Sequence, residues 1–491
     1  MKHSPHTLPL SNSFAALPKN FYAQAAPTPT LNAVELIHFN AAAAELLELD
    51  PACQQTTEFS AIFSGNQPLS DAAHIAMRYA GHQFGQLVPS LGDGRAIMLG
   101  ETTNSKGERW EIQLKGSGMT PFSRMGDGRA VLRSTIREYL CSEAMHGLGI
   151  PTTRALCITG CADKVYREQI ETSAILTRLA PSHVRFGSLE YFYYRNQHEQ
   201  SKLLLDYVIS HHYPELSGSN NPYLALLGEV ITRTARLIAQ WQSVGFCHGV
   251  MNTDNMSILG LTLDYGPYGF LDGYDPRHIC NHSDHSGRYA YDQQPDIGLW
   301  NLACLAQTLL PFISEADARQ ALDQYWTVFE TEYSQLMRSK LGFETDKEEI
   351  AQLTTRLLTQ MQHSQIDFTC LFRELCHVQR DSDQPHQALS DMFLDRPAFK
   401  QWLNDYRMAL QKYARADAAR QAAMKQVNPK YILRNHMAQT AIEKAESDKD
   451  YDEIDRLINL LHRPFDEHPD MEDYAAQAPA WAREIAVSCS S

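Results

Sequence analysis

The spacing of hydrophobic and polar residues changes along the chain and predicts a strand-rich part followed by a helical part. Between about residues 80 and 190, short apolar runs are separated by turn residues. Runs 96–101 and 110–116, with Asn104 to Gly107 between them, predict a β-hairpin. Further strands are predicted at residues 154–160, 164–168 and 173–180.

Helical periodicity appears inside the strand-rich part and dominates after residue 200. A helix is predicted at about 130–146, where Gly147 and Pro151 follow the last periodic residue. A long amphipathic run predicts another helix at 223–244. Shorter patterns predict helices at 33–48, 297–310, 408–427 and 431–446.

Strands first and helices second favour an α+β fold with segregated lobes. The expected organisation is an N-terminal extension (1–75), a strand-rich N-lobe (76–195), a helical C-lobe (196–340) and a helical C-terminal region (341–491) with a flexible Cys-Ser-Ser tail.

Composition and charge exclude some functions. The formal net charge of -15 disfavours a nucleic-acid backbone as the main ligand, although one nucleotide needs only a few cations. The ten cysteines form no paired Cys-x-x-Cys array, which is typical of a reducing compartment. No apolar stretch is long enough to cross a membrane and no leader pattern is present. A cytoplasmic protein without nucleic-acid or membrane partners is expected.

Two features of the strand-rich part suggest phosphate binding. Gly92 and Gly94 let a turn approach a phosphate, and Arg95 adds a positive charge, although such turns are also common in hairpins. Lys115 ends a predicted buried strand, and Glu138 lies on the next helix. A strand lysine paired with a helix glutamate holds ATP phosphates in kinases, whereas an exposed strand-end lysine is the plainer alternative.

A second glycine-rich loop contains Asp127 and Gly128 and leads into the predicted helix, whose N-terminus would favour anions. Arg129, Arg133 and Arg137 recur at helical spacing. They predict one basic helix face, which is either part of the anion site or a solvated stripe.

The strongest signal follows the helix at 223–244. A loop begins at His248 and ends at Asn255, and Asp264-Tyr265-Gly266 follows. This order matches the kinase catalytic loop and metal motif, in which the Asn and the Asp bind Mg²⁺. Farther along, Asp296 fits the residue that braces this loop, or a plain helix cap.

One departure from kinases concerns the catalytic base. The position of the kinase aspartate holds Val250, and the carboxylate nearest to it in the loop is Asp254. Either the chain is inactive or Asp254 takes the proton in a changed geometry.

Long segments resemble the selenoprotein O family of protein adenylyltransferases, which have a pseudokinase fold. The matching stretches are YAGHQFG at 79–85, LGDGRA at 91–96, EIQLKGSGMTPFSRMGDGRA at 111–130, HGVMNTDNMSILGLTLDYGPYGFLD at 248–272, QPDIGLWNL at 294–302 and NPKYILRNHMAQTAI at 428–442.

The resemblance implies a protein-kinase-like bilobal fold and metal-dependent transfer of AMP from ATP to protein hydroxyls, with pyrophosphate leaving. UMP transfer from UTP, and Mn²⁺ in place of Mg²⁺, stay open. The implied nucleotide-binding residues are Gly92, Gly94, Arg95, Lys115, Asp127, Gly128, Arg178, Arg185 and Asp264. Asp254 is the implied base, Asn255 and Asp264 the implied metal ligands, and Glu138 the partner of Lys115.

The chain ends in Cys489-Ser490-Ser491, and members of the family often end in such a tail. The expectation is a redox gate in which Cys489 pairs with Cys280, against the alternative of an idle thiol at a frayed terminus.

Two other functions stay open. A kinase-type phosphotransferase would need a base where Val250 stands. An inactive nucleotide-binding scaffold would not need the metal ligands Asn255 and Asp264.

Overall fold

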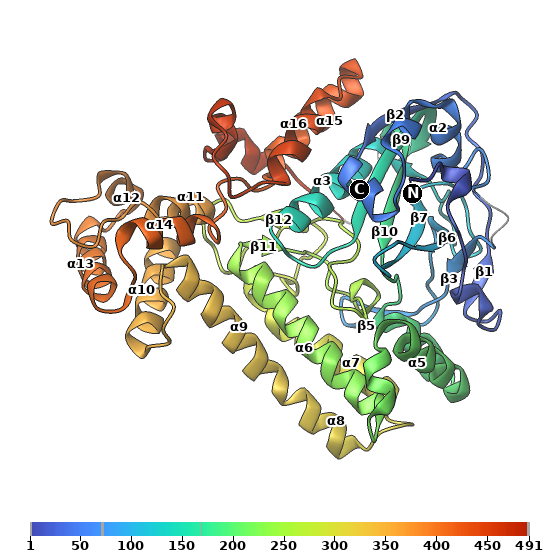
Figure 1. The fold of residues 1–491 in the computed structure, drawn as a ribbon, viewed down its shortest axis with the longest axis horizontal. Helices are drawn as coiled ribbons and strands as arrows, with labels where there is room; N and C mark the ends of the chain where they lie inside the picture. Colours follow the sequence, from blue (N-terminus) through green and yellow to red (C-terminus); the bar gives the residue numbers. More distant parts are fainter. Residues whose placement is uncertain (1, 70–72, 168, 489–491) are drawn as a thin grey trace.

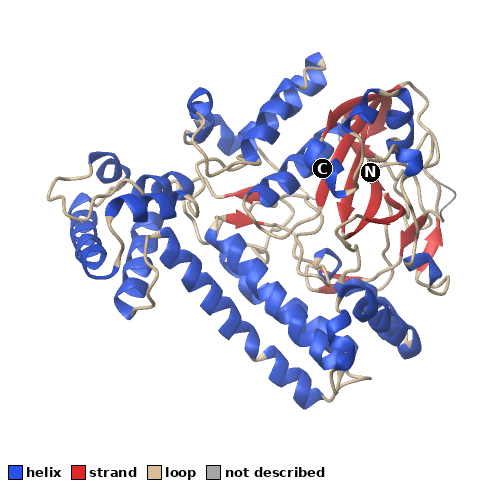
Figure 2. Ribbon diagram, viewed as in Figure 1, coloured by secondary structure: helices blue, strands red, loops and turns tan. Residues whose placement is uncertain are grey.

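A computed structural model describes residues 2–69, 73–167 and 169–488. Most of the strands gather at one end of the molecule, and helices extend away from them (Figure 1, Figure 2). The described part is therefore α+β, as predicted.

The described residues contain an eight-stranded antiparallel sheet in the order β1-β3-β6-β7-β10-β9-β2, with β8 paired to β10. Its strands are β1 (Tyr22–Gln24), β2 (Val34–Phe39), β3 (Ile75–Met77), β6 (Ala96–Thr103), β7 (Arg109–Lys115), β8 (Ala130–Val131), β9 (Arg154–Tyr166) and β10 (Ile170–Ala180). The predicted β6–β7 hairpin is confirmed, with Ala96 opposite Lys115. Two short strand pairs lie elsewhere: β4 (Gly81–Gln83) with β5 (Gln86–Val88), and β11 (Phe246–Cys247) with β12 (Gly269–Phe270).

Two predictions in the sheet were wrong. The helix expected at 33–48 is strand β2 followed by α1 (Ala41–Leu46), because β2 pairs with β9 and the side chain of Asn40 then caps the helix. The strands expected at 154–160 and 164–168 are one strand, β9, which ends at Tyr166, and Glu168 lies outside the described residues. Pairing with β2 and β10 keeps the turn-like stretch near Cys161 extended.

Helix α3 (Leu132–Gly147) packs on β9 and β10 and also contacts α15 and α16. A second group of helices forms around α6, which contacts α7, α8 and α9. The remaining helices near the sheet and in this group are α2 (Thr57–Phe63), α4 (Phe186–Tyr193), α5 (His198–His212), α6 (Pro222–Ser243), α7 (Gln294–Leu309), α8 (Glu315–Leu322) and α9 (Gln324–Lys340).

The C-terminal helices fall into two places in Figure 1: α10 to α14 lie at the end far from the sheet, and α15 and α16 lie beside α3. They are α10 (Glu348–Ser364), α11 (Phe368–Leu375), α12 (Gln387–Met392), α13 (Arg396–Tyr413), α14 (Asp417–Lys425), α15 (Asn435–Asp448) and α16 (Asp452–Leu461). The single helix expected at 408–427 is broken between α13 and α14. Buried Arg420 of α14 donates to the carbonyl of Val378. This contact joins residues that are distant in the sequence, so the local helical pattern could not predict it.

Three hydrophobic clusters form the core of the described residues. The largest joins one face of the sheet to α3 and the helices around α6, and a second lies among α9 to α14. The third lies between the other face of the sheet and α1 and α2. Neighbouring residues of β10 divide between the faces: Leu176 belongs to the first cluster, and Ile175 and Leu179 belong to the third.

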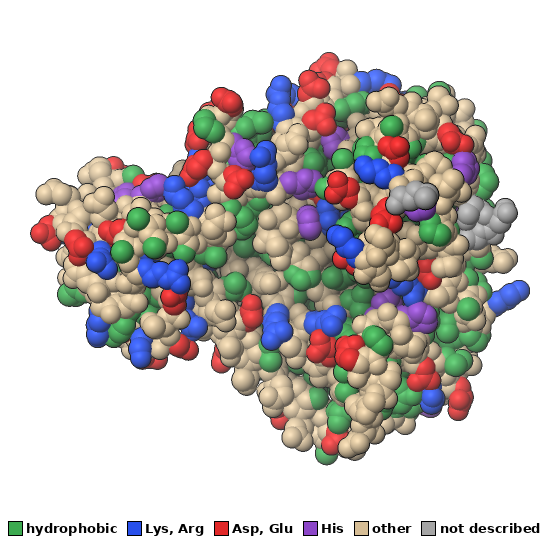
Figure 3. Space-filling view, viewed as in Figure 1, with side chains coloured by type: hydrophobic (Ala, Val, Ile, Leu, Met, Phe, Trp, Pro, Cys, Tyr) green, Lys and Arg blue, Asp and Glu red, His purple; other side chains and the backbone are tan. Residues whose placement is uncertain are grey.

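No helix among the described residues is long and apolar enough to span a bilayer. On the face shown in Figure 3, acidic and basic side chains are interspersed, so the negative net charge does not gather in one patch there.

Candidate active site

A cavity of about 500 Å³ opens between the sheet and the loops that follow α6. Most residues predicted for the site line it: Gly92, Gly94, Arg95, Lys115, Asp127, Gly128, Arg178, Asp254, Asn255 and Asp264. Glu138 and Arg185 lie behind this lining, and Cys280 lies outside it.

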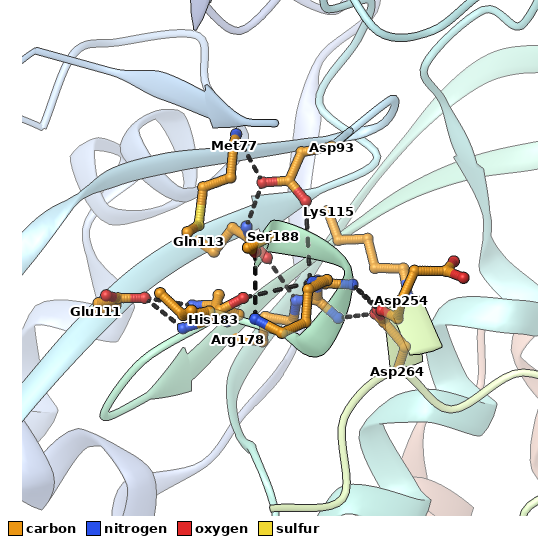
Figure 4. A network of polar contacts seen from close by, with 12 residues as sticks. Met77, Asp93, Glu111, Gln113, Lys115, Arg178, His183, Ser188, Asp254 and Asp264 are labelled. Atoms are coloured by element: carbon orange, nitrogen blue, oxygen red, sulfur yellow. Dashed lines mark hydrogen bonds and ion pairs between the residues drawn. The ribbon is translucent and has the colours of Figure 1, made fainter. Parts of the chain in front are cut away.

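An ion cluster forms the floor of the cavity. Lys115 Nζ, at the end of β7, lies 2.5 Å from Glu138 Oε2 of α3 and 3.1 Å from Asp264 Oδ1. Arg178 of β10 donates to Asp264 and, at 3.1 Å, to Glu138 Oε1. Strands β7 and β10 are paired here, so the two cations come from neighbouring strands of the sheet (Figure 4).

Asp264 is the shared anion of this cluster. Its second oxygen accepts from Arg185 Nη1 at 2.8 Å, and its backbone φ of 61° is in the left-handed region. Burial alone would raise the pKa of Asp264. The charges of Arg178, Lys115 and Arg185 outweigh burial and hold that pKa well below its usual range. Asp264 is therefore an anion at any physiological pH.

Arg185 supports the site from behind. It is buried, it donates to the backbone carbonyl of Asp254 at 2.8 Å, and its guanidinium stacks over the Tyr79 ring at 4.6 Å. The resemblance implies that Arg185 belongs to the nucleotide-binding residues, which stays a prediction. In this structure its guanidinium links the Asp254 backbone to the Asp264 carboxylate.

The turn that contains Gly92 and Gly94 is held by Asp93, which sequence reasoning missed. The buried Asp93 carboxylate accepts from the Met77 amide at 3.0 Å and from Gln113 Nε2 at 3.2 Å (Figure 4). A Cβ on Gly92 would meet Phe122 Cγ at 2.5 Å, so the turn needs glycine for space as well as for its φ of 148°. Arg95 is exposed at the cavity edge.

The second glycine-rich loop forms the opposite rim. Asp127 binds the guanidinium of Arg167 with two hydrogen bonds, at 2.8 and 2.9 Å, and Arg167 also lines the cavity. Gly128 has a φ of 68°, and a Cβ on it would lie 2.1 Å from the carbonyl oxygen of Gly118. The loop continues into β8 rather than directly into α3, so β8 separates Asp127 from the helix N-terminus along the chain.

The predicted basic helix face was wrong. Arg129 precedes the helix and lines the cavity, Arg133 pairs with Glu171, and buried Arg137 donates to the carbonyl of Tyr268 at 3.1 Å. Each arginine has its own partner, so they form neither a solvated stripe nor one anion site.

The loop that carries Asp254 contains a short 3₁₀ turn, Thr253–Asn255. Asp254 is 8% exposed, and its Oδ2 accepts from Gln83 Nε2 at 3.1 Å. Burial raises the pKa of Asp254 to about 6, although the Gln83 hydrogen bond acts in the opposite direction. A carboxylate with this pKa can accept a proton near neutral pH.

The position that holds the catalytic aspartate in kinases carries no base in this chain. Val250 lines the cavity and has no titratable group. Asn255 donates Nδ2 to the Val250 carbonyl at 2.9 Å, which leaves its side-chain oxygen as the atom able to bind a cation.

The loop is braced by α7, but not through Asp296. Gln294 accepts from the His248 amide at 2.8 Å and donates to the Phe246 carbonyl at 2.9 Å. Asn301 donates to the Met251 carbonyl at 2.9 Å. Asp296 is exposed in the first turn of α7, where the N-cap residue is Gln293.

The predicted redox pair is only half described. Cys280 is buried, and its thiol lies 3.0 Å from the Pro267 carbonyl oxygen. Burial raises the pKa of Cys280 well above its usual range. Cys489 lies outside the described residues. The last described part of the chain does approach Cys280, because the His282 amide donates to the Val487 carbonyl at 2.9 Å.

Sequence reasoning missed several residues of the site. Gln83 and Tyr79 lie in YAGHQFG, a segment that carried the resemblance but received no role. Arg167 sits at the tip of the β9–β10 hairpin, and no local pattern marks it. Asn252 lines the cavity and accepts from the Tyr289 hydroxyl at 2.6 Å.

Comparison with known proteins places the chain in a family. The family model described as "Protein adenylyltransferase SelO" matches residues 6–462. A protein named "Protein nucleotidyltransferase YdiU" from Thioalkalivibrio sulfidiphilus is 56% identical, with 100% of both chains covered. Proteins of the same name from Myxococcus xanthus and Thiobacillus denitrificans are each 53% identical, with 99% of both chains covered. The predicted family and its activity of nucleotidyl transfer onto proteins are thereby confirmed, and the chain belongs to the SelO family of protein adenylyltransferases.

Proposed function

We propose that the chain transfers AMP from ATP to Ser, Thr or Tyr hydroxyls of proteins, with UMP from UTP as the alternative. One observation carries the proposal. One cavity of about 500 Å³ brings together the cations Lys115 and Arg178, the oxygen-bearing side chains of Asn255 and Asp264, and the carboxylate of Asp254, whose pKa is raised. Each group matches one requirement of phosphoryl chemistry.

The phosphate chain is the part of the substrate that these cations fit. Lys115 and Arg178 present positive charge in the cavity, and the Gly92–Gly94 turn lets backbone approach a phosphate closely. Arg124 and Arg129 also line the cavity and add further charge, whereas Arg167 is paired there with Asp127. These features support predicted phosphate binding by Lys115, Arg178, the Gly92–Gly94 turn with Arg95, and the Asp127–Gly128 loop.

Asn255 and Asp264 are the proposed ligands of Mg²⁺ or Mn²⁺. Both offer oxygen atoms to the cavity, and the low pKa of Asp264 keeps its carboxylate ionised. Oxygen donors of this kind suit both ions. When bound, the ion would supply charge neutralisation of the triphosphate.

The proposed reaction forms a bond between the acceptor hydroxyl oxygen and the α-phosphorus and breaks the bond from that phosphorus to pyrophosphate. The hydroxyl proton passes to the carboxylate of Asp254. Lys115 and Arg178 stabilise negative charge on the phosphates as pyrophosphate leaves. The products are a protein carrying a nucleoside monophosphate in a phosphodiester, and pyrophosphate.

The proposed architecture is a kinase-like pair of lobes, 76–195 and 196–340, with the cavity between them, an N-terminal extension at 1–75 and a C-terminal region at 341–491. Support comes from the pairing of Lys115 with Glu138 and from Asn255 and Asp264 on loops after α6. The N-terminal segment contributes β1 and β2 to the main sheet, so we propose that it folds together with the N-lobe.

Two alternatives are less consistent with the site. A kinase would need a carboxylate where Val250 lines the cavity. An inactive scaffold would not need a buried base such as Asp254 beside the proposed metal ligands Asn255 and Asp264.

Mass spectrometry of modified proteins tests the proposal. The chain is incubated with a protein mixture, with ATP or UTP, and with Mg²⁺ or Mn²⁺. We expect nucleoside monophosphate on Ser, Thr or Tyr side chains, and the comparison identifies the preferred nucleotide and ion. Phosphate alone on those side chains would contradict the proposal.

A further inference from the structure

Strand β4 (Gly81–Gln83) lies directly against the 3₁₀ turn that carries Asp254. The His82 amide donates to Thr253 Oγ1 at 2.7 Å, and Gln83 Nε2 donates to Asp254 Oδ2 at 3.1 Å. A Cβ on Gly81 would lie 2.3 Å from Asp254 Oδ1. All three residues of the strand therefore define where this turn and its carboxylate can lie.

A buried carboxylate joins β4 to the same turn. Glu190 of α4 is 0% exposed, and its two oxygens have different partners. Oε2 accepts from the Thr253 hydroxyl at 2.5 Å, and Oε1 lies 2.6 Å from His82 Nδ1. The Thr253 hydroxyl is thus used twice, as donor to Glu190 and as acceptor from the His82 amide.

The cluster of His82, Glu190 and Cys304 is better explained by hydrogen bonds than by a bound metal ion. The ligand atoms of His82, Glu190 and Cys304 lie within 4.8 Å of one another. However, His82 Nδ1 and Glu190 Oε1 are 2.6 Å apart, whereas two ligands of one tetrahedral zinc ion at ~2.0–2.1 Å would be about 3.3 Å apart. Hydrogen bonds satisfy both oxygens of Glu190 without an ion.

We propose that His82, Gln83 and Glu190 are positioning residues for the base: the His82–Glu190 pair fixes Thr253, and Gln83 fixes the adjacent Asp254 carboxylate. The inference rests on the proposed role of Asp254. It extends that role from one residue to a network that joins β4, α4 and the 248–255 loop. None of the three residues needs to touch the reacting atoms. Their effect is on the placement of the Asp254 carboxylate.

Two substitutions at Thr253 separate positioning from simple packing. Thr253→Val keeps the shape and removes both hydrogen bonds, whereas Thr253→Ser keeps the hydroxyl. We expect Thr253→Val to lower kcat by roughly 10–100-fold with little change in the nucleotide KM, because small misplacements of a catalytic group have effects of this size. Thr253→Ser should stay within about threefold of wild type.

The matched control is Thr308→Val. Thr308 is equally buried, but its hydroxyl bonds only to the Leu305 carbonyl within α7, at 2.7 Å. It reports the effect of losing a buried hydroxyl elsewhere. A Thr253→Val enzyme whose kcat equals that of Thr308→Val would overturn the inference.

Gln83→Met gives a second readout, because it removes the hydrogen bond to Asp254 Oδ2 and keeps a side chain of similar length. We expect kcat to fall by roughly 10–100-fold with little change in the nucleotide KM. A kcat equal to that of wild type would overturn the role of Gln83, and this variant keeps the test open if Thr253→Val does not fold. Asp254→Asn separates the two levels. If Asp254→Asn keeps full activity, the proposed base is wrong. If Asp254→Asn loses activity and Thr253→Val keeps it, only the positioning network is wrong.

Discussion

At the scale of single residues, the site contains two aspartates with opposite electrostatic surroundings. Asp264 faces three cations, so its pKa is held low, whereas burial is the dominant effect at Asp254 and raises its pKa to about 6. Groups separated in this way can divide two tasks: a permanent anion suits a cation ligand, and a carboxylate near neutrality suits a base.

Asp254→Asn should remove the base and leave the shape. We expect a fall in kcat of roughly 10²–10⁴ with little change in nucleotide affinity. Steady-state kinetics give kcat, and a separate binding measurement gives the nucleotide affinity. Loss of binding with retained turnover would mean that Asp254 is structural.

The same variant has a consequence for stability that depends on pH. Because the folded-state pKa of Asp254 is raised from 3.8 to about 6, ionisation disfavours the folded state as the pH rises through that range. Asn cannot ionise, so Asp254→Asn should be more stable at pH 8 by up to about 3 kcal/mol. The gain should shrink as the pH falls toward 4. Urea denaturation at pH 4.5 and 8 measures it, and an equal gain at both would contradict the assigned environment.

Replacing Asp264 should have a larger structural effect. Asp264→Ala leaves the buried guanidiniums of Arg178 and Arg185 without their shared anion. Breaking a buried pair in this way costs about 3–5 kcal/mol, and loss of an electrostatic group at the centre of the site costs ~10²–10³ in rate or more. Rate and denaturation midpoint are both measured. Activity within about twofold of wild type would refute the assignment of Asp264.

At the scale of elements, the sequence predicted those helices and strands that a local pattern of apolar residues determines. The hairpin β6–β7 follows from two apolar runs around a turn, and α6 from a long amphipathic period. The helix expected at 33–48 failed because β2 pairs with a strand more than a hundred residues away. The pairing of Arg167 with Asp127 and the contact of Gln83 with Asp254 arise only when distant segments meet, so no spacing could show them.

Gly81→Ala tests the contact of β4 with the base. The new Cβ would meet Asp254 Oδ1 at 2.3 Å, so the carboxylate must move, and we expect kcat to fall by about 10²-fold with nucleotide binding retained. Gly228→Ala in α6 is the control, since a Cβ there has nothing within 4 Å and alanine stabilises a helix by roughly 0.5–1 kcal/mol. Equal activity of the two variants would show that the contact is unimportant.

At the scale of the whole molecule, the chain returns to the neighbourhood of the site near its end. Val487 is buried and accepts a hydrogen bond from His282, two residues after Cys280. The contact is consistent with the predicted Cys280–Cys489 disulfide, which stays a prediction.

If that disulfide forms, reductant should raise activity and Cys489→Ser should mimic reduction. In the entropy model, closing so long a loop restricts the unfolded chain by about 5 kcal/mol, so the oxidised form should also be more stable. Peptide mapping of the oxidised protein, with rates before and after reduction, checks both effects. No Cys489 crosslink and an unchanged rate would leave the terminal cysteine as a plain thiol.

The central claim is that this site transfers a nucleotidyl group rather than the terminal phosphate. Two parallel incubations of the chain with acceptor protein, one with ATP labelled at the α-phosphate and one with ATP labelled at the γ-phosphate, test it most directly, with Asp254→Asn as the control. Stable protein label from the α-position alone, lost in Asp254→Asn, is the predicted result. Label from the γ-position, or α-label that persists undiminished in Asp254→Asn, would contradict the account.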